Sequence, residues 1–303
     1  MPAQLTAEAM APAVDVGACA RLFQHARALA RRILIRQQRG EVTTRFERGV
    51  HPRRRKGAGD SFWQYRPFES GEPARLVDWR RSARSDRLYV REHEWETNRV
   101  LWLWVDRSTR MRFASRSGLP SKEARALLIG FTAAWMAWES GELAGWLDDR
   151  RYGAVTRSAA RRLLAAASHD SSSDLQALGQ LPLRPGSRLL VVSDGLWPVE
   201  RLAACLDRWR RRGLRAMVVT LVDPAEERFP YSGRLLLEAT GDEDVRLLVE
   251  DGEAAAEAID RQLAAHHQAV TSLLAGAGVP HLRLATATGE EASAALLAGL
   301  LPW

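Results

Sequence analysis

Cysteine and lysine are scarce in this sequence, and each scarcity limits what the chain can be. Cys19 and Cys205 are the only cysteines among 303 residues, which excludes a disulfide framework and a cysteine-based zinc pattern. Both lie in Ala- and Leu-rich stretches with a helical pattern, so we expect buried free thiols. Lysine occurs only at positions 56 and 122, and every other basic side chain is arginine.

The net charge is +7, but an arginine bias this strong is typical of GC-rich coding sequences. Only a local basic cluster therefore counts as evidence for a nucleic-acid partner. The densest cluster spans residues 51–56, in a stretch with the composition of a loop. It could contact phosphates. We favour a solvated loop that pairs with acids elsewhere, because no aromatic side chain interleaves its arginines.

Long apolar runs are also missing. No segment approaches the roughly 18 consecutive apolar residues that suggest a membrane-spanning helix. Residues 1–20 lack the charged and apolar regions of a signal peptide. We therefore expect a soluble, cytoplasmic protein without a transmembrane segment.

The sequence contains none of the familiar catalytic motifs. The seven histidines include no His-Glu-x-x-His metal pair. No predicted strand is followed by a Gly-x-Ser-x-Gly elbow, a P-loop or a Gly-x-Gly-x-x-Gly turn. We therefore name no catalytic residue and expect a protein that is not an enzyme.

Strand and helix patterns alternate regularly through most of the chain. Strands are predicted at 100–105, 143–147, 188–192, 214–222 and 281–285, and helices at 121–140, 158–167, 199–212, 252–277 and 290–301. A β-hairpin is expected within 235–249. This alternation predicts an α/β fold in three layers, Rossmann-like, with a mainly parallel central sheet.

Two domains are expected from the change of pattern near residue 96. Residues 1–96 would hold an N-terminal helix, 18–39, followed by an irregular region with some β-structure. Residues 97–303 would form the α/β domain, including the late hairpin and the C-terminal helices.

Polar residues follow two of the predicted strands at the point where each ends. Val100–Val105 is an unbroken apolar run, typical of a central strand buried on both faces, and Asp106 and Ser108 come directly after it. Asp194 follows a later strand in the same way, and a serine-rich loop at 171–173 lies between them in sequence. The carboxyl ends of parallel strands meet at one edge of a sheet, where such oxygens could hold Mg²⁺. Alternatively, Asp106 and Ser108 could simply cap a turn.

Three blocks of sequence are similar to known family motifs. The first resembles R-Y-x-x-G-D-x-x-R-x-I-D-W-x-x-S-A-R, with Phe68 and Glu72 replacing Tyr and Asp, and it supplies Gly71, Arg75, Asp78, Trp79, Ser82 and Arg84. Residues 106–111 resemble Asp-x-Ser-x-Ser-Met, and the third block is 193–195. Together they resemble the DUF58 family, built around a von Willebrand factor A-like (vWA) domain, from about residue 45 to the C-terminus. In the first block we expect Asp78 to form ion pairs and Trp79 to be buried.

The resemblance implies a metal-ion-dependent adhesion site (MIDAS) at the sheet edge. Its Mg²⁺ ligands would be Asp106, Ser108, the residue at 110, Ser173 and Asp194. Position 110 is Arg110 where the family has Ser, and a guanidinium cannot bind a cation. Arg110 could turn to solvent and leave a weakened site, or it could lie between the two aspartates as a built-in cation. We favour the second alternative, because paired carboxylates at a buried edge need a counter-charge.

The resemblance also implies a function without catalysis. Proteins of this family resemble companions of MoxR-type AAA+ ATPases, which implies protein–protein interaction in assembly, maturation or chaperone-like work. An acidic partner side chain could bind Arg110 directly, beside Thr109. Trp197 could anchor the same interface or pack under the loop. Nucleic-acid binding through 51–56 and an uncharacterised metal-dependent enzyme are the alternatives.

Overall fold

The computed structural model of the chain divides into two units. The larger unit joins Met1–Phe46 to Arg99–Trp303, and the smaller is Glu47–Asn98. The residues whose structure is described are 10–41, 56–68, 77–83, 87–94, 100–147, 151–153, 157–167, 183, 185–238 and 246–301.

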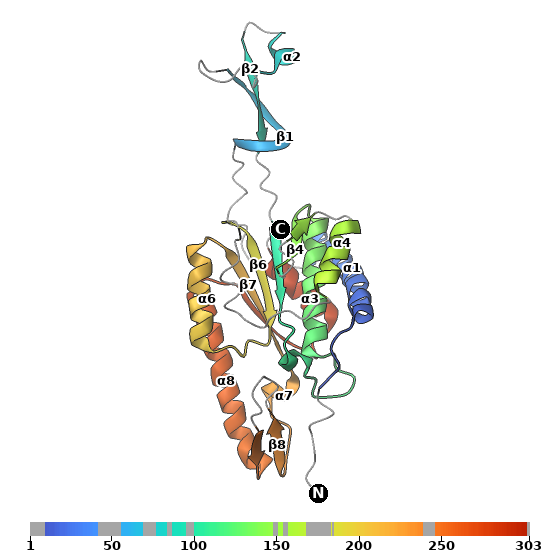
Figure 1. The fold of residues 1–303 in the computed structure, drawn as a ribbon, viewed down its shortest axis with the longest axis vertical. Helices are drawn as coiled ribbons and strands as arrows, with labels where there is room; N and C mark the ends of the chain where they lie inside the picture. The colour runs from blue at the N-terminus through green and yellow to red at the C-terminus, as the bar shows by residue number, and fades with distance from the viewer. Residues whose placement is uncertain are drawn as a thin grey trace. The chain divides into compact units, whose positions relative to one another are not determined.

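A six-stranded sheet forms the middle of the larger unit (Figure 1). The strands lie in the order β10-β7-β6-β3-β4-β5, and all neighbours are parallel except the last pair, which is antiparallel. Their bounds are β3 (Val100–Val105), β4 (Leu143–Trp146), β5 (Arg151–Gly153), β6 (Arg188–Ser193), β7 (Arg215–Val222) and β10 (His281–Ala285). The predicted mainly parallel sheet is confirmed.

β3 is the central strand that its apolar run predicts. It pairs with β6 on one side and β4 on the other, and all its residues after Val100 are buried. Side chains of a strand alternate between the two faces of the sheet. Leu101 and Leu103 therefore join one apolar layer, and Trp102 and Trp104 join the other.

Helices cover both faces of the sheet and complete the three layers (Figure 1). One apolar layer joins the sheet to α1 (Val16–Gln38), α3 (Lys122–Glu139), α4 (Arg157–Ala167) and α9 (Glu290–Leu300). The other joins the opposite face to α6 (Val199–Arg211) and α8 (Gly252–Gly276). Cys19 lies in the first layer and Cys205 in the second, both as buried free thiols, as expected.

The N-terminal helix belongs to this core. Phe23 of α1 packs against Phe131 and Trp135 of α3, with 5.2 Å between ring centroids in each pair, and the indole N–H of Trp135 donates to the Phe23 carbonyl at 3.2 Å. The predicted boundary at residue 96 grouped this helix with the region that follows it. In the structure the apolar stripe of α1 is instead covered by the α/β unit.

The described residues of the smaller unit form an antiparallel pair of strands and a short helical turn. β1 (Lys56–Pro67) pairs with β2 (Tyr89–Glu94). The turn α2 (Trp79–Ser82) precedes β2, and Val77 forms an isolated bridge with Val90. These elements agree with the β-structure expected between the N-terminal helix and the α/β domain.

The signature residues fall partly within this described region. Asp78 caps α2, because its carboxylate accepts a hydrogen bond from the backbone N–H of Arg81 at 2.9 Å. Ser82 is buried and accepts from the backbone N–H of Tyr89 at 2.9 Å. Trp79 is 61% exposed, so the expectation that it is buried is wrong. The remaining signature residues, Gly71, Arg75 and Arg84, lie outside the described residues, as do 51–55 of the basic loop.

A second antiparallel pair follows β7, after the short helix α7 (Pro224–Glu227). β8 (Leu235–Glu238) and β9 (Arg246–Val249) form the predicted hairpin, just before α8. Leu235 is buried in it, whereas Leu247 is exposed.

None of the helices in the described part of the chain is both long and apolar enough to cross a membrane.

Candidate functional site

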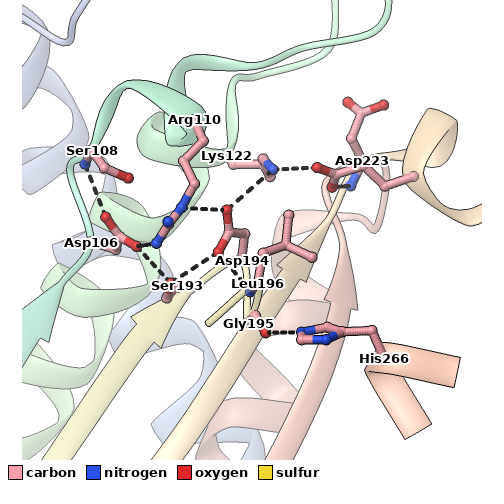
Figure 2. A network of polar contacts seen from close by, with 11 residues as sticks. Asp106, Ser108, Arg110, Lys122, Ser193, Asp194, Gly195, Leu196, Asp223 and His266 are labelled. Atoms are coloured by element: carbon pink, nitrogen blue, oxygen red, sulfur yellow. Dashed lines mark hydrogen bonds and ion pairs between the residues drawn. The ribbon is translucent and has the colours of Figure 1, made fainter. Parts of the chain in front are cut away.

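Two buried acids meet at the carboxyl edge of the sheet, where β3 and β6 end side by side (Figure 2). Asp106 directly follows β3, and its backbone N–H donates to the Val192 carbonyl of β6 at 2.8 Å, which continues the strand pairing by one residue. Asp194 directly follows β6. The two side chains are completely buried, so their charges need partners within the protein.

Arg110 lies between the two acids (Figure 2). The 3₁₀ turn Thr109–Arg112 turns the chain back over the edge of the sheet. Arg110 Nη2 then lies 3.1 Å from Asp106 Oδ2, and Arg110 Nε lies 3.1 Å from Asp194 Oδ2. Burial lowers the pKa of Arg110, but the charges of Asp194 and Asp106 outweigh burial and raise it, so the guanidinium stays charged.

Local hydrogen bonds hold both carboxylates in place. Asp106 Oδ1 accepts from the backbone N–H of Ser108 at 2.9 Å, and Asp194 Oδ1 accepts from that of Leu196 at 3.0 Å. The hydroxyl of Ser193 lies 2.7 Å from Asp106 Oδ2 and 3.3 Å from Asp194 Oδ1. Asp106 therefore does cap its own turn, as one alternative predicted, and it faces Arg110 as well.

Lys122 completes the charge network, although none of the sequence motifs includes it. Its side chain is 1% exposed at the start of α3, and its ammonium lies 3.7 Å from Asp194 Oδ2 and 2.5 Å from Glu226 Oε1. One signal was available, because Lys122 is one of only two lysines in an arginine-rich chain. A lysine retained in such a chain suggests a place that a guanidinium would not fit.

The family of the chain follows from a comparison of its sequence with known families. Residues 64–269 match the family described as "Protein of unknown function DUF58". The chain belongs to the DUF58 family. The match covers more than half of the chain and includes both strand-end acids, while no curated protein matches the sequence.

Two solved structures are similar to this DUF58 chain. One is the crystal structure of the conserved hypothetical protein BatB from Bacteroides thetaiotaomicron, with 13% identity, coverage of 66% of this chain and 96% of that one, and a TM-score of 0.33. The other is an aerotolerance-related membrane protein from Bacteroides fragilis NCTC 9343 with multiple mutations to serines. It has 11% identity, the same coverage of both chains and a TM-score of 0.35.

The other predicted site residues have different outcomes in the DUF58 chain. Thr109 is exposed and precedes Arg110 in the 3₁₀ turn. Trp197 is 3% exposed and packs in the apolar layer with α6, which contradicts its assignment as a partner-binding residue. The chain turns back into the core after Gly195, so the indole lies beneath the loop. Ser173 lies outside the described residues.

The oxygen donors at this edge suit Mg²⁺ by type, but their arrangement does not fit it. Asp106, Ser108 and Asp194 offer the carboxylate and hydroxyl oxygens that Mg²⁺ prefers, and the buried Ser108 hydroxyl has no hydrogen-bond partner among the described residues. The guanidinium of Arg110, however, fills the position between the carboxylates. Within the described part of the chain, no cluster of three His, Cys, Asp or Glu side chains could hold a metal.

A separate buried ion pair fastens the loop that carries Arg110. Arg107 and Glu123 are 2% and 0% exposed and lie 2.8 Å apart. Arg107 also donates to the carbonyls of Val14 and Ala167, and Glu123 accepts from the backbone N–H of Val14 at 3.0 Å. The pair thus joins four segments, namely the lead into α1, the loop after β3, the start of α3 and the end of α4.

Helix α8 lies on the other side of the Asp194 loop. His266 Nε2 lies 3.0 Å from the Gly195 carbonyl oxygen (Figure 2). Burial and nearby Arg283 lower the pKa of His267 to about 4, so His267 is neutral at pH 7. A depression of about 440 Å³ adjoins the site, with Glu226, His267 and Arg283 in its lining.

Proposed function

We propose that this DUF58 chain is a non-enzymatic, vWA-like protein-interaction module that uses a degenerate MIDAS. Its partner would bind at the edge where β3 and β6 end, and Arg110 would replace the metal ion there. One observation carries the proposal, the guanidinium that lies 3.1 Å from both Asp106 and Asp194. Asp106 and Asp194, which would bind the metal ion of a MIDAS, are already paired with the guanidinium of Arg110.

Arg110 has the donors and the exposure needed to contact a partner. A guanidinium has five N–H donors, and the two aspartates face only Nε and one N–H of Nη2. The remaining donors can bind a carboxylate in the bidentate geometry that arginine favours. The side chain is 34% exposed, and exposed Thr109 lies beside it. The proposed partner group is therefore an Asp or Glu side chain, bound without a metal bridge.

Metal independence is tested by titrating the protein with Mg²⁺ in a calorimeter. Mg²⁺ would have to displace the guanidinium and bind beside it, and like charges near 4 Å repel strongly at an intermediate dielectric constant. We expect no saturable heat at millimolar Mg²⁺. Saturable binding in that range would contradict the proposed replacement of the metal by Arg110.

The partner that we propose is a MoxR-type AAA+ ATPase, acting with this chain in assembly, maturation or chaperone-like work. The test is affinity capture from the native host in buffer containing a chelator, with wild type, Arg110→Ala and Arg210→Ala as baits. Arg210 is a matched control, because its side chain is 78% exposed and pairs with Asp207 on α6. We expect the wild type and Arg210→Ala to recover the ATPase and Arg110→Ala to lose it. Equal recovery by all three baits would exclude this edge as the interface.

Nucleic-acid binding through 51–56 is the alternative that we do not favour. Fluorescence anisotropy with oligonucleotides at low and moderate salt tests it, because phosphate contacts weaken as salt rises, and we expect no affinity even at low salt. A cytoplasmic location is tested by fractionation of the native host, where we expect the chain in the cytosolic fraction.

A further inference from the structure

Lys122 is a second buried cation at the same edge, and it shares Asp194 with Arg110. Its ammonium lies 3.7 Å from Asp194 Oδ2, the same oxygen that lies 3.1 Å from Arg110 Nε. We propose that Arg110 and Lys122 together take the place of one divalent cation. Both would then have to be removed before the edge can bind Mg²⁺.

The position of Lys122 in its helix is unfavourable for a cation. It is the first residue of α3, directly after the N-cap Ser121. The N-terminus of a helix carries a partial positive charge, which favours acids and disfavours lysine. Burial to 1% exposure adds a cost for the charged form. Nothing within α3 therefore explains a lysine at this position. Its two acidic partners, Asp194 and Glu226, do explain it.

Glu226 also fixes where the ammonium of Lys122 lies. Glu226 Oε1 lies 2.5 Å from Lys122 Nζ, and Glu226 Oε2 accepts from the backbone N–H of Asp223 at 2.9 Å. The Phe113 ring, 5.7 Å from the ammonium, closes another side. Lys122 is thus held in place from α7 and cannot turn away to make room for a metal ion.

The two cations of the protein match in number the charge of the metal that they would replace. Asp106 and Asp194 carry two negative charges, and Arg110 and Lys122 carry two positive charges, as many as one Mg²⁺, while Glu226, the nearer partner of Lys122, adds a third carboxylate beside them. Removing Arg110 alone leaves Asp194 paired with the ammonium of Lys122. A Mg²⁺ ion bound between the aspartates would then lie near a fixed positive charge, in a buried place where screening by solvent is weak.

Our proposal rests on the proposed function in one respect, because both place the site at the edge where β3 and β6 end. The test of the proposal, however, needs no partner protein. A failure of this inference is therefore distinguishable from a failure of the partner assignment. A single substitution should therefore not restore metal binding. Arg110→Ser supplies the hydroxyl that the MIDAS pattern expects, but it leaves the ammonium of Lys122 beside Asp194.

The experiment is a calorimetric Mg²⁺ titration of four proteins, namely wild type, Arg110→Ser, Lys122→Met and the double variant. We expect saturable binding in the double variant, at least about a hundredfold tighter than in either single variant, because a like charge near 4 Å weakens binding by that order. Equal affinity of Arg110→Ser and the double variant would show that Lys122 has no part in excluding the metal. A double variant without Mg²⁺ affinity would also overturn the proposal.

A matched control removes a different buried cation from the same helix. Arg125 is 6% exposed and donates to the Thr286 carbonyl at 2.8 Å, away from the two aspartates. Arg110→Ser combined with Arg125→Met should gain no affinity for Mg²⁺. A gain in Mg²⁺ affinity equal to that of Arg110→Ser with Lys122→Met would mean that a less tightly packed α3, and not the loss of Lys122, allows the metal to bind.

Thermal unfolding keeps the test decisive if the double variant does not fold without metal. The melting temperature of the double variant should rise with MgCl₂ and not with NaCl at matched ionic strength, and wild type should respond equally to the two salts. A double variant that stays unfolded in both salts would contradict the inference, because Mg²⁺ would then not replace the two cations.

Discussion

At the scale of single residues, charge compensation decides the geometry of the candidate site. Asp106 and Asp194 are brought together by the pairing of β3 with β6, and two like charges at a buried edge repel each other. Arg110 fits between them because its planar guanidinium presents several donors in fixed directions. The site is therefore best described as a set of buried charges in which only Arg110 is partly exposed among Asp106, Asp194, Arg110 and Lys122.

Removing one of the acids should leave Arg110 with an incomplete set of partners. Asp106→Asn is expected to lower the free energy of unfolding by about 2–3 kcal/mol, below the usual range for a broken buried pair because Arg110 is one-third exposed. Urea denaturation measures the change. Asp207→Asn is the control, since Asp207 pairs with exposed arginines on α6 and should cost less than about 1 kcal/mol. Equal small losses in both variants would contradict the account of the buried site.

The acids of the site could be predicted from sequence, but the contact that its second cation makes could not. Asp106 and Asp194 each follow an apolar strand, and the rule that strand ends share one edge brings them together. The contact of Lys122 with Asp194 depends on where the start of α3 docks, which no local pattern records. Trp197 shows the same limit, because its spacing from Asp194 does not reveal whether the chain turns inward after Gly195.

At the scale of secondary-structure elements, the apolar patterns predicted most of the order along the chain. The continuous run of β3, the alternation of strands with helices and the late hairpin all have strong local signals. The place of α1 was not predictable in the same way. An amphipathic stripe shows that a helix has a buried face, but it does not show which part of the chain covers that face.

The loop after β6 depends on a glycine in the left-handed region. Gly195 has φ +77°, and a Cβ there would lie 2.8 Å from Thr220 Cγ2. Thr220 cannot easily move, because its hydroxyl lies 2.9 Å from His281 Nε2. We expect Gly195→Ala to lower the free energy of unfolding by about 2–4 kcal/mol, as positive φ and steric overlap add.

Gly141 separates these two causes. It has φ +78°, yet a Cβ at that position would meet nothing within 4 Å. Gly141→Ala should therefore lower the free energy of unfolding only by the conformational part, about 1–2 kcal/mol. Chemical denaturation of both variants gives the steric part as the difference, and no difference would show that the Asp194 loop can relax around a side chain.

At the scale of the whole molecule, two neutral histidines link stability to pH. Burial and Arg283 lower the pKa of both His267 and His281 to about 4, below the value of about 6.5 for an unfolded chain. The unfolded state therefore binds protons first as the pH falls. The stability associated with the neutral histidines is complete above pH 6.5 and is lost progressively down to about pH 4.

This loss should be measurable before most carboxylates titrate. Between pH 6.5 and 5 we expect the free energy of unfolding to fall, with a slope of up to about 1.4 kcal/mol per pH unit for each histidine. His267→Gln should reduce the slope. The control is His25→Gln, since the His25 side chain is 44% exposed on α1. A slope unchanged by His267→Gln would exclude His267 as a source of the pH dependence.

The most direct test is a crystal structure of the wild-type protein grown with a high concentration of Mg²⁺. We expect the Arg110 guanidinium to lie between Asp106 and Asp194, with no metal ion between the two carboxylates. An ion with the octahedral geometry and the roughly 2.0–2.1 Å oxygen distances of Mg²⁺, and Arg110 turned to solvent, would contradict it.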